Sequence, residues 1–149
     1  MPDYELVIVG GGPAGCAAAV YAARKQLKTL LVTEEFGGQS TVSPEIYNWI
    51  GTTAIPGVDL AKDLENHVRE YEGDYLTIKE KVRVNSTKQT DNHFEVCTND
   101  GESVTTQALL VASGSRRRKL DIPGAAEFEN RGVVYCASCD GPLFKDMDV

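Results

Sequence analysis

Two cysteines and an aspartate near the end of the chain have the spacing of a redox centre. Cys136 and Cys139 form a C-x-x-C pair, and Asp140 follows directly. This spacing allows a small disulfide to close and reopen, and it can lower a thiol pKa from about 8.5 toward neutrality. A neighbouring carboxylate can protonate a departing thiolate. The three residues therefore predict thiol–disulfide exchange, with Cys136, Cys139 and Asp140 as the catalytic residues.

A zinc site and an inert buried pair are the alternative interpretations of these cysteines. A structural zinc ion needs four ligands, whereas the sequence has one C-x-x-C pair, and His67 and His93 lie too far apart to form a histidine pair. Gly141 and Pro142 mark an exposed turn beside the cysteines, which disfavours an inert pair. We therefore expect no metal site.

A glycine-rich turn near the N-terminus matches a dinucleotide-binding fingerprint. Gly10, Gly12 and Gly15 form G-x-G-x-x-G between the apolar run 4–9 and an alanine-rich stretch that starts with Pro13. The first glycine permits a tight turn, the second lets the backbone approach a pyrophosphate, and the third allows close packing of helix on strand. The fingerprint does not distinguish FAD from NAD(P), and a turn without a ligand is the alternative.

An acidic residue about 20 positions beyond this turn is expected to bind the ribose hydroxyls. Thr33 ends the predicted second strand, where that acid would stand, and Glu34 follows it. We nominate Glu34, with Glu35 as the alternative. Exposed loop carboxylates are the competing interpretation of both residues.

The order of the predicted elements indicates an α/β fold. The apolar run 4–9, the helix beginning at Pro13 and the apolar run 28–33 predict a strand–helix–strand unit with parallel strands. The stretch 34–57, rich in glycine and proline, predicts a long loop of the kind that binds ligands.

The second half of the chain predicts mostly strands. A helix follows residue 57, with Leu60, Leu64 and Tyr71 on one face and Gly73 at its end. Short strands between 75 and 113, with turn signals between them, predict a small antiparallel meander and then a return to the parallel sheet at 108–113.

Composition and charge limit the classes of partner. The net charge of −7 and the pI near 4.8 argue against a nucleic-acid partner, and no apolar run approaches the length needed to span a membrane. Four cysteines without a secretory signal favour the cytoplasm, where Cys16 and Cys97 would be small buried residues. The basic run 116–119 is interpreted as a solvated loop, with an anion-binding patch as the alternative.

Five sequence blocks resemble one enzyme family in order and spacing. They are IVGGGPAGCAAAVYAAR, FGGQ, NW, ALLVASG and YCASCDGPLF. The sequence resembles the low-molecular-weight thioredoxin reductases and is also similar to the flavoprotein component of alkyl hydroperoxide reductase. The resemblance implies FAD at the first fingerprint, NADPH as the electron source, a thioredoxin-like or peroxiredoxin-system protein as acceptor, and a homodimer.

The resemblance also implies a role for each matching residue. Cys139 would face the flavin, Cys136 would exchange with the protein substrate, and Asp140 would be the acid. Asn48 would reach the flavin side, and Val82 would meet the adenine through its backbone. The cofactor-binding residues would be Gly10, Gly11, Gly12, Pro13, Ala14, Gly15, Thr33, Glu34, Gly38, Gln39, Asn48, Val82, Ala112, Ser113 and Gly114.

Two regions are expected by comparison with that family. Residues 1–115 would form the N-terminal part of a Rossmann-like FAD-binding domain, and 116–149 would begin an NADPH-binding domain that carries the C-x-x-C motif. The family's second glycine fingerprint is expected just beyond this sequence, so we expect a truncated chain without an NADPH site and without turnover by itself. A reductase for a peroxiredoxin system and a non-catalytic FAD-binding or redox-sensing module are the alternative functions.

Overall fold

The chain divides into two compact units. The computed structural model describes residues 1–115, 118–129, 131–135 and 141–148. The first unit is Met1–Gly114 and the second is Ser115–Val149. Among these residues, no helix has both the length and the apolar character needed to cross a membrane.

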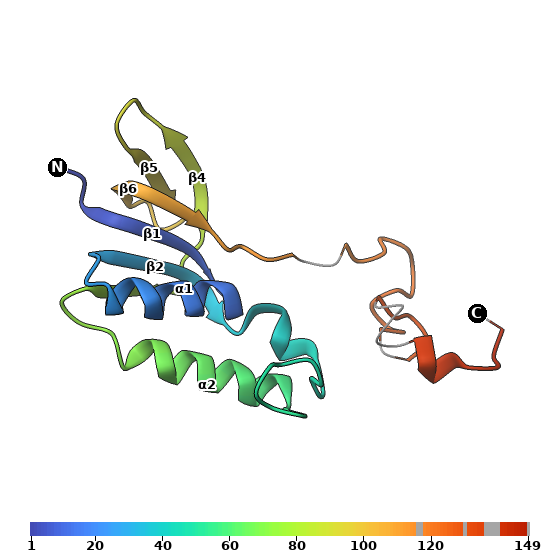
Figure 1. The fold of residues 1–149 in the computed structure, drawn as a ribbon. Helices are drawn as coiled ribbons and strands as arrows, with labels where there is room; N and C mark the ends of the chain where they lie inside the picture. Colours follow the sequence, from blue (N-terminus) through green and yellow to red (C-terminus); the bar gives the residue numbers. More distant parts are fainter. Residues whose placement is uncertain (116–117, 130, 136–140, 149) are drawn as a thin grey trace. The chain divides into compact units, whose positions relative to one another are not determined.

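The first unit is built on one six-stranded sheet with the order β3-β2-β1-β6-β5-β4 (Figure 1). Two α-helices and a short 3-10 helix connect its first three strands. The elements are β1 (Tyr4–Gly11), α1 (Pro13–Arg24), β2 (Thr29–Phe36), η1 (Gly38–Val42), α2 (Gly57–Arg69), β3 (Leu76–Glu80), β4 (Val84–Gln89), β5 (Phe94–Thr98) and β6 (Ser103–Val111). The second unit contains the 3-10 helix η2 (Gly141–Phe144).

The parallel part of the sheet is larger than the sequence predicted. β1 pairs in parallel with β2 and with β6, and β2 pairs in parallel with β3. The assignment of β3 to the antiparallel meander was therefore wrong, because α2 carries the chain back and lets β3 enter beside β2. The two strands predicted between 102 and 113 form the single strand β6. Its first half pairs with β5, and its second half pairs with β1.

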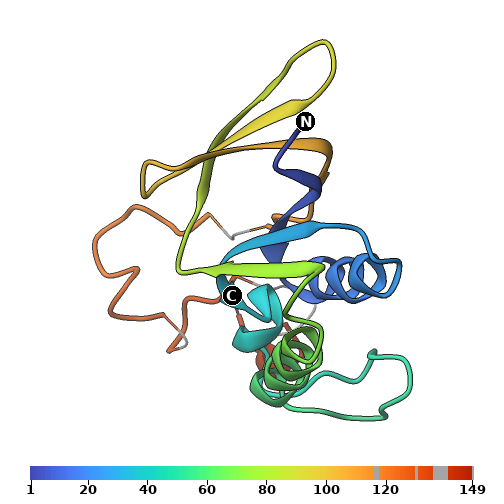
Figure 2. The same ribbon diagram turned by 90° about the vertical axis from the view of Figure 1, so that its left-hand side faces the viewer.

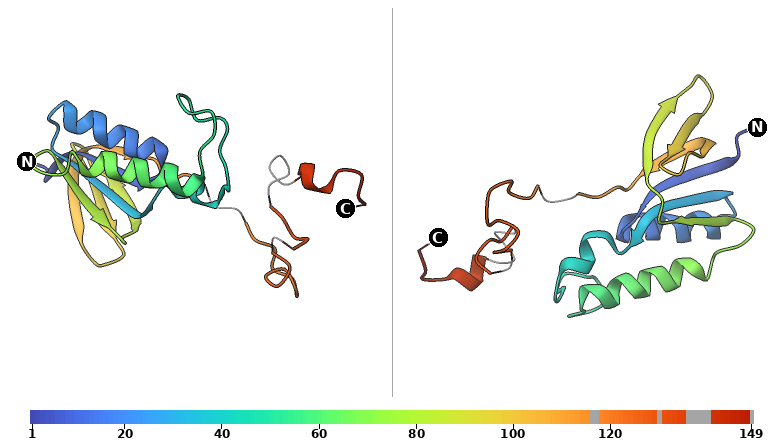
Figure 3. Two further views of the ribbon diagram at one scale, coloured as in Figure 1. Left: turned by 90° about the horizontal axis from the view of Figure 1, so that it is seen from below. Right: turned by 180° about the vertical axis from the view of Figure 1, so that it is seen from behind.

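Apolar residues cover both faces of the parallel strands, so the unit has three layers. Ile8 and Leu31 face α1 and α2, where they form a core with Val68 and Leu76. Val7, Leu30 and Val32 point the other way and form a second core with Val96 of the meander. Figures 2 and 3 show the helices on one side of β1 and β2 and the β4–β5 hairpin on the other. Continuous apolar runs are expected of strands that are buried on both faces.

A surface ion pair joins the edge strand β3 to the meander. The Lys79 ammonium lies 2.8 Å from the Asp100 carboxylate in the turn between β5 and β6. Hydrogen bonds from Lys79 and from Thr98 lower the pKa of Asp100 to about 2. A lowered carboxyl pKa stabilises the folded state above the ordinary pKa of the group, and this contribution is lost as the pH falls toward 2.

The boundaries of two elements differ from the sequence prediction. β2 continues through Glu34 and Glu35 to Phe36, so both glutamates belong to the strand and not to the predicted loop. Hydrogen bonding explains this difference, because Gly11 at the end of β1 pairs with Phe36 and extends the ladder. α2 ends at Arg69, and Tyr71 packs on the helix-side core from the segment that follows.

Replacing Leu31 by alanine should lower the free energy of unfolding by about 2–5 kcal/mol, because the side chain is fully buried and its removal leaves a cavity. The matched control is Leu27→Ala, since Leu27 is 36% exposed and precedes the same strand. Urea unfolding of both variants would check this expectation. Equal losses at the two positions would show that the helix-side core is not packed as described.

Candidate functional site

The glycine turn lies at the carboxyl end of β1, where the strand order changes direction. The chain leaves β1 through α1 to reach β2 on one side, and it returns much later as β6 on the other. Both neighbours run parallel to β1, so their carboxyl ends flank the turn. Open α/β sheets bind ligands in the crevice at such a switch point.

Two of the fingerprint glycines are required by packing within the protein. A Cβ atom on Gly10 would lie 2.3 Å from the carbonyl oxygen of Ala112, and the φ angle of Gly10 is +111°. A Cβ atom on Gly15 would lie 1.8 Å from the carbonyl oxygen of Gly10. These contacts are with backbone atoms and cannot be relieved by rotating a side chain. Gly10 and Gly15 therefore allow β1, α1 and the end of β6 to pack closely.

Gly12 differs from the other two because no atom lies within 4 Å of a Cβ built on it. It is the N-cap of α1, Pro13 opens the helix, and no side chain caps the first turn. An uncapped helix N-terminus presents backbone N–H groups and the positive end of the helix dipole. Open space in front of such a terminus fits a diphosphate group.

The carbonyl oxygen of Gly11 joins three segments at the base of the turn. It accepts a hydrogen bond from the Gly37 amide at 2.9 Å and from the Cys16 thiol at 3.2 Å. A Cβ on Gly11 would lie 2.5 Å from the hydroxyl oxygen of Thr33. The G-x-G-x-x-G motif allows any residue type at position 11, but the fold of this chain leaves no room there for a side chain.

The end of β2 brings several predicted ribose and adenine contacts together. Thr33 is buried, and its hydroxyl donates to the carbonyl oxygen of Glu35 at 2.6 Å. Glu34 and Glu35 are exposed directly beside it. The amide of Val82 donates to the Thr33 carbonyl at 3.3 Å, so an adenine contact of the Val82 backbone would have to use its carbonyl.

The segment after β2 approaches the glycine turn directly. A Cβ on Gly38 would lie 3.5 Å from the Cα of Gly12, and the exposed Gln39 follows in η1. On the other side of the turn, the Ala112 amide donates to the Val9 carbonyl at 2.8 Å. Ser113 and Gly114 continue from Ala112 as exposed residues. The predicted residues that follow β2 and β6 therefore lie on either side of the turn.

The remaining predicted site residues are Asn48 and the three redox residues. Asn48 is exposed in the loop between η1 and α2, where hydrogen bonds between Ile46 and Ile55 join the two ends of the loop. Cys136, Cys139 and Asp140 lie outside the residues that the structure describes. Within the second unit, the Leu120 amide donates to the hydroxyl of Tyr135 at 3.0 Å. The Lys119 ammonium pairs with the Glu129 carboxylate at 2.7 Å.

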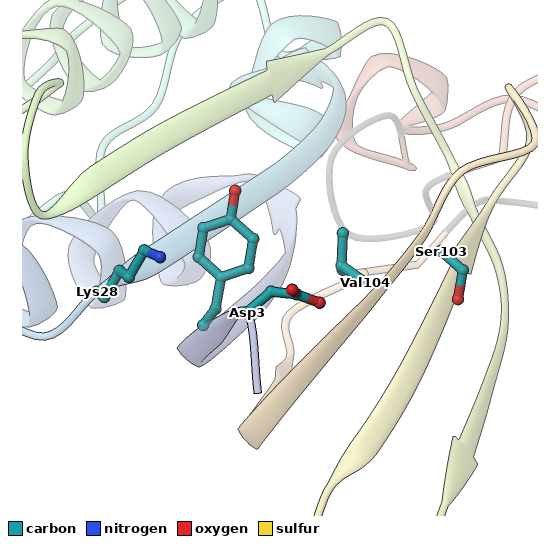
Figure 4. Close-up of a pocket in the computed structure, with 5 residues that line it drawn as sticks. Asp3, Lys28, Ser103 and Val104 are labelled. Carbon is teal, nitrogen blue, oxygen red and sulfur yellow. The ribbon is translucent and has the colours of Figure 1, made fainter. Parts of the chain in front are cut away.

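A shallow cleft lies at the opposite end of the parallel strands (Figure 4). Its volume is about 370 Å³, and the residues that line it are Asp3, Tyr4, Lys28, Ser103 and Val104. All five are at the amino ends of β1, β2 and β6. Dinucleotides bind at the carboxyl ends of parallel strands, so this cleft is not the candidate site.

Sequence reasoning did not identify the small residues that bring α2 close to the turn. A Cβ on Gly37 would lie 2.2 Å from the Cβ of Ala61, and a Cβ on Gly57 would lie 1.8 Å from the Ser40 carbonyl oxygen. Gly57 and Ala61 are four residues apart and share one face of the helix. The four-residue spacing of these two small residues was the sequence feature that could have predicted the close approach of α2.

The fold and the glycine turn are those of the dinucleotide-binding class of α/β proteins, and the comparisons identify the family. Residues 4–149 match the family described as pyridine nucleotide-disulphide oxidoreductase. The chain belongs to this family of oxidoreductases. Its Rossmann-like fold, with a parallel sheet and a small antiparallel meander, confirms the predicted fold class.

Curated relatives and solved structures agree with this assignment. The chain is 41% identical to an alkyl hydroperoxide reductase component of Pseudomonas aeruginosa and 40% identical to an NADH dehydrogenase of Bacillus subtilis. Each match covers 98% of this chain and 28% of the relative. Thioredoxin reductase of Lactococcus lactis superposes with a TM-score of 0.77 at 35% identity, over 95% of this chain and 46% of that one. The chain therefore spans less than half the length of these proteins.

Burial should make Cys16 unreactive toward alkylating reagents. Loss of solvent around the thiol raises the pKa of Cys16 from 9.0 to about 11. The thiolate is the nucleophile, so alkylation in the folded chain should be slow near neutral pH and should speed up as the pH rises toward 11. Peptide mapping by mass spectrometry after iodoacetamide treatment at pH 8 should find Cys16 unmodified, and modified once urea unfolds the chain. Rapid labelling of Cys16 in the folded chain would contradict its placement beneath the glycine turn.

Proposed function

We propose that this chain supplies the FAD-binding and dithiol region of a disulfide reductase of the thioredoxin reductase type. Electrons would pass from NADPH through FAD to a Cys136–Cys139 disulfide, and then to a thioredoxin-like protein. The observation that carries the FAD part is the open space at Gly12 in front of the uncapped α1 N-terminus. Family membership over residues 4–149 supports the redox part.

The residues around the turn would divide the dinucleotide between them. Backbone amides of Gly12, Ala14 and Gly15 would hold the diphosphate, since Pro13 has no N–H group to donate. Glu34 would bind the ribose at the exposed rim of β2, with Glu35 as its alternative. Gly38, Gln39 and Ala112–Gly114 would line the two sides of the crevice, and Asn48 would reach the flavin.

The dithiol would perform the exchange step in the second region. When bound, FAD supplies two-electron transfer between a nicotinamide and the disulfide. Reduction breaks the Cys136–Cys139 bond, and two electrons and two protons give two thiols. Cys136 would then attack the disulfide of the protein acceptor to form a mixed disulfide, and Asp140 would protonate the departing thiolate. Attack by Cys139 on Cys136 would break the mixed disulfide, release the second acceptor thiol and re-form the Cys136–Cys139 disulfide. Residues 1–115 would belong to the FAD-binding domain and 116–149 would begin the NADPH-binding domain.

A reductase that serves a peroxiredoxin system is the second candidate. The identity of 41% to the alkyl hydroperoxide reductase component supports it as an alternative to the thioredoxin-like acceptor. Steady-state assays of a full-length protein with thioredoxin-like and peroxiredoxin acceptors would separate the two candidates. A homodimer in the cytoplasm, without nucleic-acid or membrane partners, completes the proposal.

Gly12→Ala should weaken FAD binding by at least about tenfold with only a small loss of stability, because the added methyl group enters open space and alanine is merely a poorer N-cap residue than glycine. FAD titration followed by flavin fluorescence, together with urea unfolding, measures both effects. Gly15→Ala is the contrasting variant, since its methyl group meets the Gly10 carbonyl oxygen and should destabilise the fold itself. Unchanged FAD affinity in a folded Gly12→Ala chain would refute the placement of the diphosphate.

The cysteine pair should behave as an exchangeable redox couple. Equilibration in glutathione or dithiothreitol buffers, followed by alkylation and mass spectrometry, should give a potential of about −200 to −270 mV. Asp140→Asn should slow disulfide exchange and leave the potential nearly unchanged, because the carboxyl group moves a proton. A potential below about −300 mV would instead identify a structural disulfide.

A further inference from the structure

The segment that follows β2 is held between α2 and the glycine turn. Gly37 faces α2, where a Cβ on Gly37 would lie 2.2 Å from the Cβ of Ala61. Gly38 faces the turn, where a Cβ would lie 3.5 Å from the Cα of Gly12. The position of this segment is therefore limited by the size of the side chain at residue 61.

α2 contacts the same segment again one turn earlier. The Gly57 amide donates to the Ser43 carbonyl at 3.1 Å, and a Cβ on Gly57 would lie 1.8 Å from the Ser40 carbonyl oxygen. Gly57 and Ala61 are both buried. η1 thus packs closely against a face of α2 that carries small residues at positions 57 and 61.

The other end of the segment is also fixed. Phe36 pairs with Gly11 in the sheet, and the Arg69 guanidinium of α2 lies 5.4 Å from the centre of its ring. The next residue, Gly37, donates its amide to the Gly11 carbonyl at 2.9 Å. A displacement caused by a larger residue at position 61 therefore cannot be absorbed at Phe36, and it must act on Gly37 and Gly38.

We propose that Ala61 is a positioning residue for the dinucleotide: its small side chain leaves the room that Gly37 and Gly38 need to take their places beside the Gly10–Gly15 turn. Ala61 does not contact the ligand and acts through Gly37. A larger side chain pushes the 37–39 segment away from α2, distorts the Gly37–Gly11 hydrogen bond and changes the width of the crevice beside Gly12. This inference rests on the proposed binding of FAD at the turn.

Ala61→Val tests the proposal in the 149-residue chain, with two readouts. FAD affinity, measured by flavin fluorescence, should fall about tenfold or more, because overpacking at this contact displaces the crevice wall. Hydrogen exchange of the Gly37 amide, measured by NMR without any ligand, should become about tenfold faster or more as its bond to Gly11 weakens.

Ala22→Val is the matched control, because Ala22 is a buried alanine in the last turn of α1, remote from Gly12 along the helix. It should lose comparable stability in urea but keep FAD affinity and Gly37 exchange within about twofold. Ala61→Gly, which removes the methyl group without adding bulk, should also keep FAD affinity within about twofold.

The outcomes separate this inference from the proposed function. If the unsubstituted chain fails to bind FAD, the proposed function fails, and Gly37 exchange alone decides whether Ala61 positions the segment. Unchanged Gly37 exchange in a folded Ala61→Val chain overturns the inference. Equal losses of FAD affinity in Ala61→Val and Ala22→Val also overturn it, because the effect would then be general destabilisation.

Discussion

The hydrogen bonds to the Gly11 carbonyl oxygen hold the candidate site together. One comes from the Gly37 amide after β2 and the other from the Cys16 thiol in α1, so a single acceptor ties the turn to both neighbouring elements. These hydrogen bonds are important because Gly11 is buried: without them its carbonyl oxygen would have neither a protein partner nor water. The thiol stays protonated because burial raises the pKa of Cys16 to about 11, and it can therefore remain a donor.

The site combines close packing on one side with open space on the other. Gly10, Gly15 and Gly37 lie where a side chain would collide with neighbouring atoms, whereas Gly12 faces nothing within 4 Å. Tight packing of backbone segments places the uncapped end of α1 rigidly, and the open side leaves its N–H groups accessible. This arrangement suits an anionic ligand that is recognised through the backbone, because recognition then requires no charged side chain.

The layers of the first unit bury both faces of its small parallel sheet. Helices cover one face of β1 and β2, and the meander covers the other, so Ile8 and Val7 are both fully buried. Lys79 joins the edge strand β3 to the meander turn at Asp100. The same region matches an NADH dehydrogenase, an alkyl hydroperoxide reductase component and a thioredoxin reductase. Similarity in this region therefore does not select the electron acceptor.

The sequence by itself determined the strand–helix–strand unit, the location of the glycine turn and the fold class, because these depend on local apolar patterns and on nearby glycines. It also indicated the C-x-x-C pair and Asp140, whose roles stay predictions. Tertiary structure alone decided that β3 lies parallel to β2, that Gly11 has no room for a side chain, and that Ala61 meets Gly37. Those facts depend on contacts between segments far apart in the chain, and no local pattern of residue types encodes such distances.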